Sequence, residues 1–179
     1  MAYMNQLALD RNKDATLHWN GKGLYSVTPP ETMFGYTYHS HMIPPFKPEE
    51  GLILGSSGGT VTKLIKRIWP EASLDCVDKE SRAGGEDDSC FYLNDAYEFV
   101  LGRNYGSYDF ICIDLWNGDK VCDFIYTPEF AKKTREICNG LVCMNIPKAD
   151  SEKLIVYHDA GFNYDRHDVV EENVVSWWS

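Results

Sequence analysis

One stretch of this sequence limits the fold more than any other. An apolar run from Gly51 stops at Gly55, small residues follow, and apolar residues then recur at helical spacing from Val61 to Trp69. This pattern predicts a β-strand, a tight turn and an α-helix. Small residues let a ligand approach the backbone, and the free N–H groups at a helix start offer donors. We predict a turn that binds a phosphate or nucleoside, although such turns also occur only to let a helix pack on its strand. The turn consists of Gly55, Ser56, Ser57, Gly58 and Gly59.

Three further apolar runs each end at an acidic residue. Ser73–Val77 is followed by Asp78, Cys90–Leu93 by Asn94 and Asp95, and the run from Tyr108 closes on Asp114. An acidic residue at the end of the second strand is where nucleoside-binding α/β folds place a carboxylate against ribose hydroxyls. In open α/β sheets, ligands bind at the carboxyl ends of the strands. We expect Asp114 at that edge, where its carboxylate either faces a ligand or is bound to backbone N–H groups of residues 115–120.

The second half of the chain continues the alternation of strands and helices. Thr127 and Pro128 are typical of a helix start, and the pattern predicts a helix up to Gly140, then a strand over Leu141–Asn145. Another helix is expected from Asp150 or Ser151 to Gly161, followed by strands over residues 162–167 and 173–178 that pair as an antiparallel hairpin on the sheet edge. The predicted fold is an α/β three-layer sandwich whose sheet is mostly parallel.

Residues 1–45 are predicted to form a β arm and a short helix, and residues 46–179 the main domain. Two short strands flank Asn20 and Gly21, which is a hairpin signal, and a helix is expected from Thr28 to Tyr38. His39 and His41 are two residues apart, so they would not converge on one metal ion, and we predict no metal site.

Composition excludes several classes of protein. A net charge of −10 argues against nucleic-acid binding and favours a small, cationic substrate. No apolar run approaches a membrane span and the N-terminus lacks a signal-peptide pattern, so we expect a cytoplasmic protein without a membrane partner. The six cysteines occur singly, which predicts reduced thiols, most of them buried.

Three segments carry a family resemblance. LILGSSGGTVTKLIKRIWPEASLDCVD, LNDAYEFV and YDFICIDLWNGDKVCDFIYTPEFAKKTREIC resemble successive motifs of the spermidine synthase-like members of the class I S-adenosylmethionine-dependent methyltransferase superfamily, over a region from about Phe34 to the C-terminus. The resemblance implies a Rossmann-like fold and transfer of a methyl or aminopropyl group from S-adenosylmethionine or its decarboxylated form to a small acceptor, expected to be an amine.

The resemblance also assigns roles to residues. The turn Gly55–Gly59 matches the glycine loop at the methionine part of the cofactor, Asp78 the acidic residue at the ribose, Asp95 with Ala96 the pair at the adenine, and Asp114 the aspartate that helps to deprotonate the amine. Asn117 stands where polyamine enzymes carry a second aspartate. Methyl and aminopropyl transfer therefore both stay open, as do a methyltransferase acting on a larger acceptor and a non-catalytic nucleoside-binding or interaction protein.

Two further expectations concern binding. Several aromatic and polar residues could line an acceptor pocket or serve as core and rim packing. They are Tyr38, His41, Trp116 and Asn117. Trp177 and Trp178, beside Val174 and Val175, are expected on an exposed edge strand, which together with the resemblance predicts a homodimer.

Overall fold

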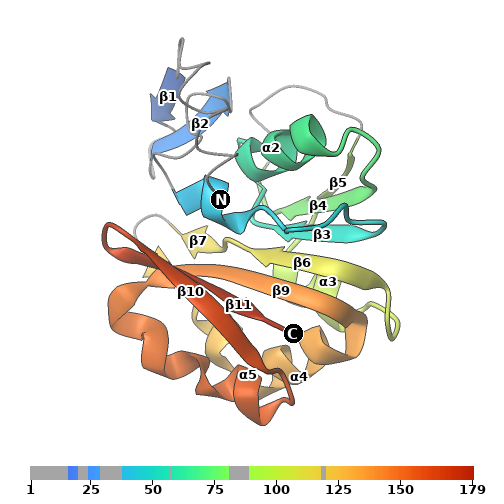
Figure 1. Ribbon diagram of the computed structural model, residues 1–179, viewed down its shortest axis with the longest axis vertical. Coiled ribbons are helices and arrows are strands. Elements are labelled where there is room, and N and C mark those ends of the chain that lie inside the picture. Colours follow the sequence, from blue (N-terminus) through green and yellow to red (C-terminus); the bar gives the residue numbers. More distant parts are fainter. Residues whose placement is uncertain (1–15, 20–23, 29–37, 57, 81–88, 118–119) are drawn as a thin grey trace.

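A seven-stranded sheet forms the centre of the molecule (Figure 1). The computed structural model describes residues 16–19, 24–28, 38–56, 58–80, 89–117 and 120–179. The strand order is β10-β11-β9-β6-β3-β4-β5, and the five strands from β9 to β5 run parallel, whereas β11 and β10 are antiparallel. The strands are β3 (Gly51–Leu54), β4 (Leu74–Asp78), β5 (Cys90–Leu93), β6 (Tyr108–Ile113), β9 (Cys138–Pro147), β10 (Tyr164–Val170) and β11 (Asn173–Trp178).

Helices cover both faces of the sheet, as Figure 1 shows, which confirms the α/β three-layer sandwich. The 3-10 helix η2 (Tyr38–Met42) and α2 (Thr60–Ile68) bury Met42, Leu64 and Ile65 against one face. On the other face α3 (Ala96–Leu101), α4 (Pro128–Ile137) and α5 (Ile155–Asp159) bury Phe99 and Phe130. The connections include a small hairpin of β7 (Trp116–Asn117) and β8 (Lys120–Val121), and the 3-10 helices η3 (Asp123–Tyr126) and η4 (Lys148–Leu154).

The predicted N-terminal hairpin is present. Strands β1 (Thr16–Trp19) and β2 (Leu24–Thr28) pair antiparallel. The turn at Asn20 and Gly21 and most of the helix predicted from Thr28 lie outside the described residues. Helix η2 packs against α2, β9 and β11. The domain boundary at residue 45 stays a prediction.

Two predicted helix boundaries are wrong. Helix α4 ends at Ile137 and β9 begins at Cys138, so Gly140 lies within the strand and not at a helix end. A Cβ at Gly140 would lie 2.0 Å from the Asp109 carbonyl oxygen, so the glycine lets β9 approach β6. The last helical region begins at Lys148 as η4 and becomes α5 only at Ile155, with no side-chain cap.

The predicted position of the two C-terminal tryptophans is also wrong. The hairpin lies at the sheet edge as predicted, but its strand β11 is an interior strand of the sheet, between β9 and β10, and β10 forms the edge. Trp177 is 2% exposed and Trp178 is 6% exposed, and they belong to the cores on opposite faces of the sheet. The argument that these side chains need a dimer to cover them therefore fails.

The cysteines agree with the sequence-based prediction. All six are free thiols, and Cys76, Cys112, Cys138 and Cys143 are buried. Across the described part of the chain, we find no helix that is long and apolar enough to cross a membrane.

Candidate functional site

The predicted site residues follow four adjacent parallel strands. Gly55 comes after β3, Asp78 ends β4, Asp95 comes shortly after β5 and Asp114 follows β6. Strand order reverses between β3 and β6, because β4 and β5 extend the sheet to one side and β6 lies on the other. Such a reversal leaves a crevice at the carboxyl ends of the strands, where α/β proteins bind ligands. The topology therefore brings Gly55 and Asp114 to the centre of this edge.

Close backbone contact explains the glycine at position 55. Its φ angle is +84°, and an added Cβ would lie 2.1 Å from the Asp114 carbonyl oxygen. The N–H of Gly55 donates to the Val77 carbonyl, and the N–H of Asp114 donates to the Leu54 carbonyl. Since any side chain would collide here, the residue type at position 55 follows directly from the packing of β3 against β6.

The rest of the turn contains a buried serine and the glycine that precedes α2. Gly59, at φ +73°, precedes α2 and gives it no side-chain cap. Ser56 is buried, and its Oγ has no hydrogen-bond partner among the described residues. A buried hydroxyl without a partner costs free energy. Ser57 lies outside the described residues, and Gly58 is buried.

Asp78 and Asp95 both accept backbone hydrogen bonds. The Asp78 Oδ1 accepts from the N–H of Glu80 at 3.0 Å. Asp95 is the N-cap of α3, and its Oδ1 accepts from the N–H groups of Tyr97 at 2.8 Å and Glu98 at 3.3 Å. Asp95 is exposed and Ala96, the first residue of the helix, is buried. Asp95 thus has a structural role whatever it binds.

Three side chains hold the carboxylate of Asp114. Its Oδ1 accepts from Trp116 Nε1 at 3.0 Å and from Asn145 Nδ2 at 2.9 Å, and its Oδ2 accepts from the Tyr38 hydroxyl at 3.3 Å. None of these donors is a backbone N–H of the loop that follows. A carboxylate can accept about four hydrogen bonds, so Oδ2 keeps room for a further donor.

Burial raises the pKa of Asp114 to about 6, and the nearby charge of Asp78 acts in the same direction. The hydrogen bonds from Asn145, Tyr38 and Trp116 lower the pKa but do not cancel the effect of burial. Burial and the adjacent carboxylate also raise the pKa of Tyr38 well above its usual value, so this hydroxyl stays protonated and donates. A carboxylate with a pKa near 6 is suited to accept protons close to neutral pH.

Asn145 was not predicted as a site residue. It lies near the carboxyl end of β9, is 1% exposed, and its Oδ1 has no partner among the described residues. A polar residue directly after the apolar run Leu141–Met144 was the available signal, but the sequence does not show that β9 lies beside β6.

Two predicted residues lie apart from these contacts. His41 Nδ1 is 3.3 Å from Asp168 Oδ2 on β10, so this side chain pairs with the hairpin. Asn117 is exposed on β7, opposite Lys120 of β8. His39 stacks on Tyr38 with ring centroids 4.0 Å apart, and burial lowers its pKa to about 4. No group of three side chains suited to a metal ion occurs among the described residues.

Sequence comparison finds a relative for half of the chain. No protein-family model matches. A polyamine aminopropyltransferase of Vibrio vulnificus (strain CMCP6) is 28% identical over 106 residues, which are 52% of this chain and 36% of that protein. The match thus spans about a third of the relative's length.

Structural comparison finds the same fold in several proteins. A probable spermidine synthase of Corynebacterium glutamicum has a TM-score of 0.61 at 14% identity, covering 73% of this chain and 55% of that one. The 1,6-didemethyltoxoflavin-N1-methyltransferase of Burkholderia thailandensis, solved with S-adenosylhomocysteine, has a TM-score of 0.59 at 12% identity, covering 78% and 73%. Human methyltransferase-like protein 13, also solved with S-adenosylhomocysteine, has a TM-score of 0.60 at 14% identity, covering 80% and 76%. The chain therefore has the class I S-adenosylmethionine-dependent methyltransferase fold and resembles the spermidine synthase-like members of that superfamily.

Proposed function

We propose that this chain transfers a carbon group from an adenosyl sulfonium donor to a small amine. The observation that carries the proposal is the half-buried carboxylate of Asp114, which lies at the strand-order reversal directly beside the Gly55 turn. Its pKa of about 6 and its three side-chain donors fit a base that accepts a proton during transfer. Asp114 is therefore the proposed catalytic residue.

The residues of the site fit S-adenosylmethionine or its decarboxylated form. In the proposal the turn Gly55–Gly59 holds the part of the donor next to the sulfur, Asp78 the ribose hydroxyls, and Asp95 with Ala96 the adenine. The position of the turn beside Asp114, at the carboxyl ends of the parallel strands, supports this placement. A bound sulfonium supplies a carbon that is activated for attack, with a neutral thioether as leaving group.

The chain contributes position and proton removal. An in-line approach of the amine to the activated carbon provides most of the rate enhancement, because the leaving group needs no acid. Asp114 Oδ2 accepts an N–H of the incoming amine, while Trp116 and Asn145 fix the carboxylate through Oδ1. The net charge of −10 raises the local concentration of a cationic substrate.

The acceptor pocket is proposed between Tyr38 and Trp116, which both contact Asp114. Asn117 and His41 then belong to its outer rim. An exposed Asn117 adds no second negative charge, which weakens the preference for a long polyamine compared with a monoamine.

Methyl transfer to a larger acceptor is the second candidate. It is favoured by the fold similarity to methyltransferases, and by a neutral Asn117 where a polyamine site would use a carboxylate. The third candidate is a non-catalytic nucleoside-binding protein. It would apply if an adenosyl sulfonium binds but its group is transferred to no acceptor.

Calorimetry tests the proposed cofactor site. S-adenosylmethionine, its decarboxylated form and methylthioadenosine are titrated into the wild type, and at least one should bind. Asp78→Ala should weaken that binding by about 1–3 kcal/mol, because a charged acceptor for ribose hydroxyls is lost. Asp159→Ala, which removes an exposed carboxylate on α5, is the control and should bind as the wild type does. Equal affinity of the Asp78 variant and the wild type would contradict the assignment of Asp78.

A further inference from the structure

Strand β10 is the last strand of the sheet, with no further strand beside it among the described residues, and it has an alternating pattern of charge. It contains Asp165, Arg166, His167 and Asp168, and all of these except Asp168 are exposed. An edge strand leaves backbone N–H and C=O groups available to pair with another strand. Proteins often block such pairing with charged side chains. The arrangement of the charges therefore decides whether this edge repels another strand or is complementary to one.

Hydrogen bonds identify which backbone groups of β10 point outward. The N–H of Lys148 donates to the Glu172 carbonyl, so these two residues form a hydrogen-bonded pair next to β9 and β11. Hydrogen-bonded pairs recur at every second residue of antiparallel strands. Even-numbered residues of β11 therefore bond to β9, and odd-numbered residues bond to β10. Consistently, Asn163 and Ser179 exchange both backbone bonds. Val175 pairs with Asp168 and Trp177 with Arg166, so these two residues of β10 face β11. His167, between these two residues, and Val169, after Asp168, direct their N–H and C=O groups away from β11, toward the free side of the strand.

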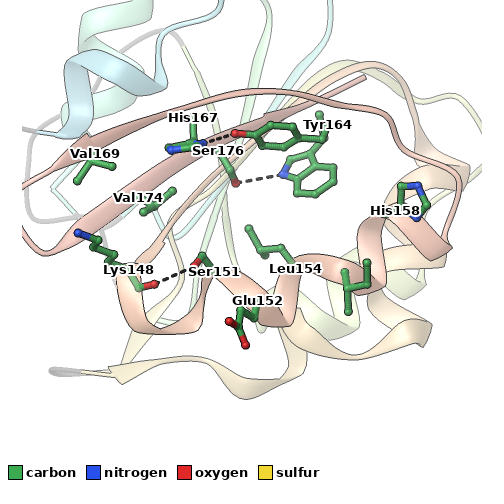
Figure 2. Close-up of a pocket in the computed structure, with 12 residues that line it drawn as sticks. Lys148, Ser151, Glu152, Leu154, His158, Tyr164, His167, Val169, Val174 and Ser176 are labelled. Carbon is green, nitrogen blue, oxygen red and sulfur yellow. Dashed lines mark hydrogen bonds between the residues drawn. The ribbon is translucent and has the colours of Figure 1, made fainter.

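Side chains of β10 alternate between the two faces of the sheet. Arg166 lies over the ring of Trp177 at 5.2 Å and Asp168 pairs with His41, which places both on the face covered by η2. Figure 2 shows the other face, where His167 and Val169 line a cavity of about 490 Å³ between the hairpin and α5. Val169 is 53% exposed, and Ile155, across the cavity, is 58% exposed.

We propose that a second copy of this chain pairs with β10 as an antiparallel strand, on a two-fold axis through His167. Outward-facing residues must pair with outward-facing residues, so the axis passes through a residue of the strand, and three such registers centre on residues 166, 167 and 168. An axis at Arg166 sets arginine opposite arginine, and an axis at Asp168 sets aspartate opposite aspartate. An axis at His167 sets Arg166 of each copy directly opposite Asp168 of the other, which forms two ion pairs.

This register makes the edge self-complementary. His167 exchanges both backbone hydrogen bonds with His167 of the second copy, and the two sheets become continuous. The cavity wall formed by His167 and Val169 is then extended by the edge of the second copy, which reduces the exposed apolar surface there. Asp114 and the Gly55 turn have no part in this pairing, and dimerisation is measured without an activity assay, so its failure is distinguishable from failure of the proposed function.

Charge exchange tests the register. By sedimentation velocity the wild type should be a dimer at tens of micromolar, and Arg166→Asp and Asp168→Arg should each weaken dimerisation at least tenfold, since each replaces two attractions by two repulsions. The double variant Arg166→Asp/Asp168→Arg should restore the dimer. Lys132→Asp, an equal charge change at an exposed site on α4, is the matched control and should leave the dimer intact. A wild-type monomer, or single variants that dimerise as the wild type does, would overturn the proposal.

A disulfide trap tests the axis directly and does not depend on the ion pairs. In a hydrogen-bonded antiparallel pair the Cα atoms are about 5.5 Å apart, which is within the range that a disulfide spans. In a Cys90→Ser background, which removes the exposed thiol, His167→Cys should form a covalent dimer under mild oxidation. Val169→Cys should not, because its counterpart lies four residues away in this register. Cross-linking at position 169 and not at 167 would rule the register out.

Discussion

At the scale of single residues, burial gives Asp114 a property that a carboxylate in water lacks. Its charged form loses hydration, and the donors on Trp116, Asn145 and Tyr38 return only part of that free energy, so the pKa rises from 3.8 to about 6. The folded protein therefore holds a proton on Asp114 more tightly than the unfolded chain does. Between pH 3.8 and about pH 6, the free energy of unfolding therefore falls as the pH rises.

This leads to opposite expectations for stability and turnover in Asp114→Asn. An asparagine Oδ1 can accept from Trp116 and Asn145, and its amide can donate to the Tyr38 oxygen, so the three contacts survive. Because asparagine does not ionise, the variant should unfold at a higher temperature than the wild type at pH 7.5, and this difference should disappear near pH 4. Turnover on the identified acceptor should fall by about 10²-fold or more if Asp114 is the base.

Asp75→Asn is the matched control for that experiment. Asp75 is a partly buried carboxylate on β4 that accepts a hydrogen bond from the Tyr108 hydroxyl at 2.7 Å, and it is not among the site residues. Its variant should keep normal turnover. Full turnover of Asp114→Asn would instead leave Asp114 a structural residue, and the site a device that only positions its substrates.

Local patterns in the sequence predicted part of this residue set. Asp114 could be placed because it ends an apolar run, and Gly55 because it interrupts one. Asn145 and Tyr38 contact Asp114 from 31 and 76 residues away in the chain, and only the strand order and the position of η2 bring them there. Such contacts have no short-range signature. Tyr38 was expected to line an acceptor pocket but not to donate to Asp114, and Asn145 was not expected at the site at all.

At the scale of elements, helix and strand types were predicted better than their ends. Thr127 and Pro128 begin α4 as expected, since Thr127 Oγ1 accepts from the N–H of Phe130. The other end was wrong because glycine is typical both of helix ends and of close backbone contacts. At Gly140 the close approach to Asp109 is the actual reason, and this contact exists only once β9 is paired with β6.

Helix α3 offers a prediction that separates two roles of Asp95. Serine is as good an N-cap as aspartate, so Asp95→Ser should keep the bonds to Tyr97 and Glu98 and change the free energy of unfolding by only a few tenths of a kcal/mol. In Asp95→Ala the free energy of unfolding should fall by about 1 kcal/mol, because the cap is lost. Urea denaturation measures this difference.

If Asp95 also contacts the adenine, both variants should bind the cofactor more weakly than the wild type does, although only the alanine variant is less stable. Calorimetry on the two variants decides the matter. Wild-type affinity in Asp95→Ser would restrict Asp95 to its role as a helix cap.

At the scale of the whole molecule, the site is assembled from four strand ends that are far apart in sequence. Residues after β3, β4, β5 and β6 meet only when the parallel sheet is complete. Helices on both faces bury this sheet in two separate cores. A ligand that contacts all four ends therefore binds the folded state and not the unfolded chain, so its binding must raise the free energy of unfolding.

Thermal unfolding in the presence of ligand measures this coupling. At a ligand concentration of 100 times Kd, the free energy of unfolding should rise by about 2.7 kcal/mol, which corresponds to about 5–11 °C in Tm for a domain of this size. Asp78→Ala at the same ligand concentration should show about half of that stabilisation if its affinity is tenfold lower. The Tm of each protein without ligand is the reference, so a change in intrinsic stability does not affect the comparison. A ligand that does not contact Asp78 would bind Asp78→Ala normally. An equal Tm shift in both proteins would therefore show that the ribose site is elsewhere.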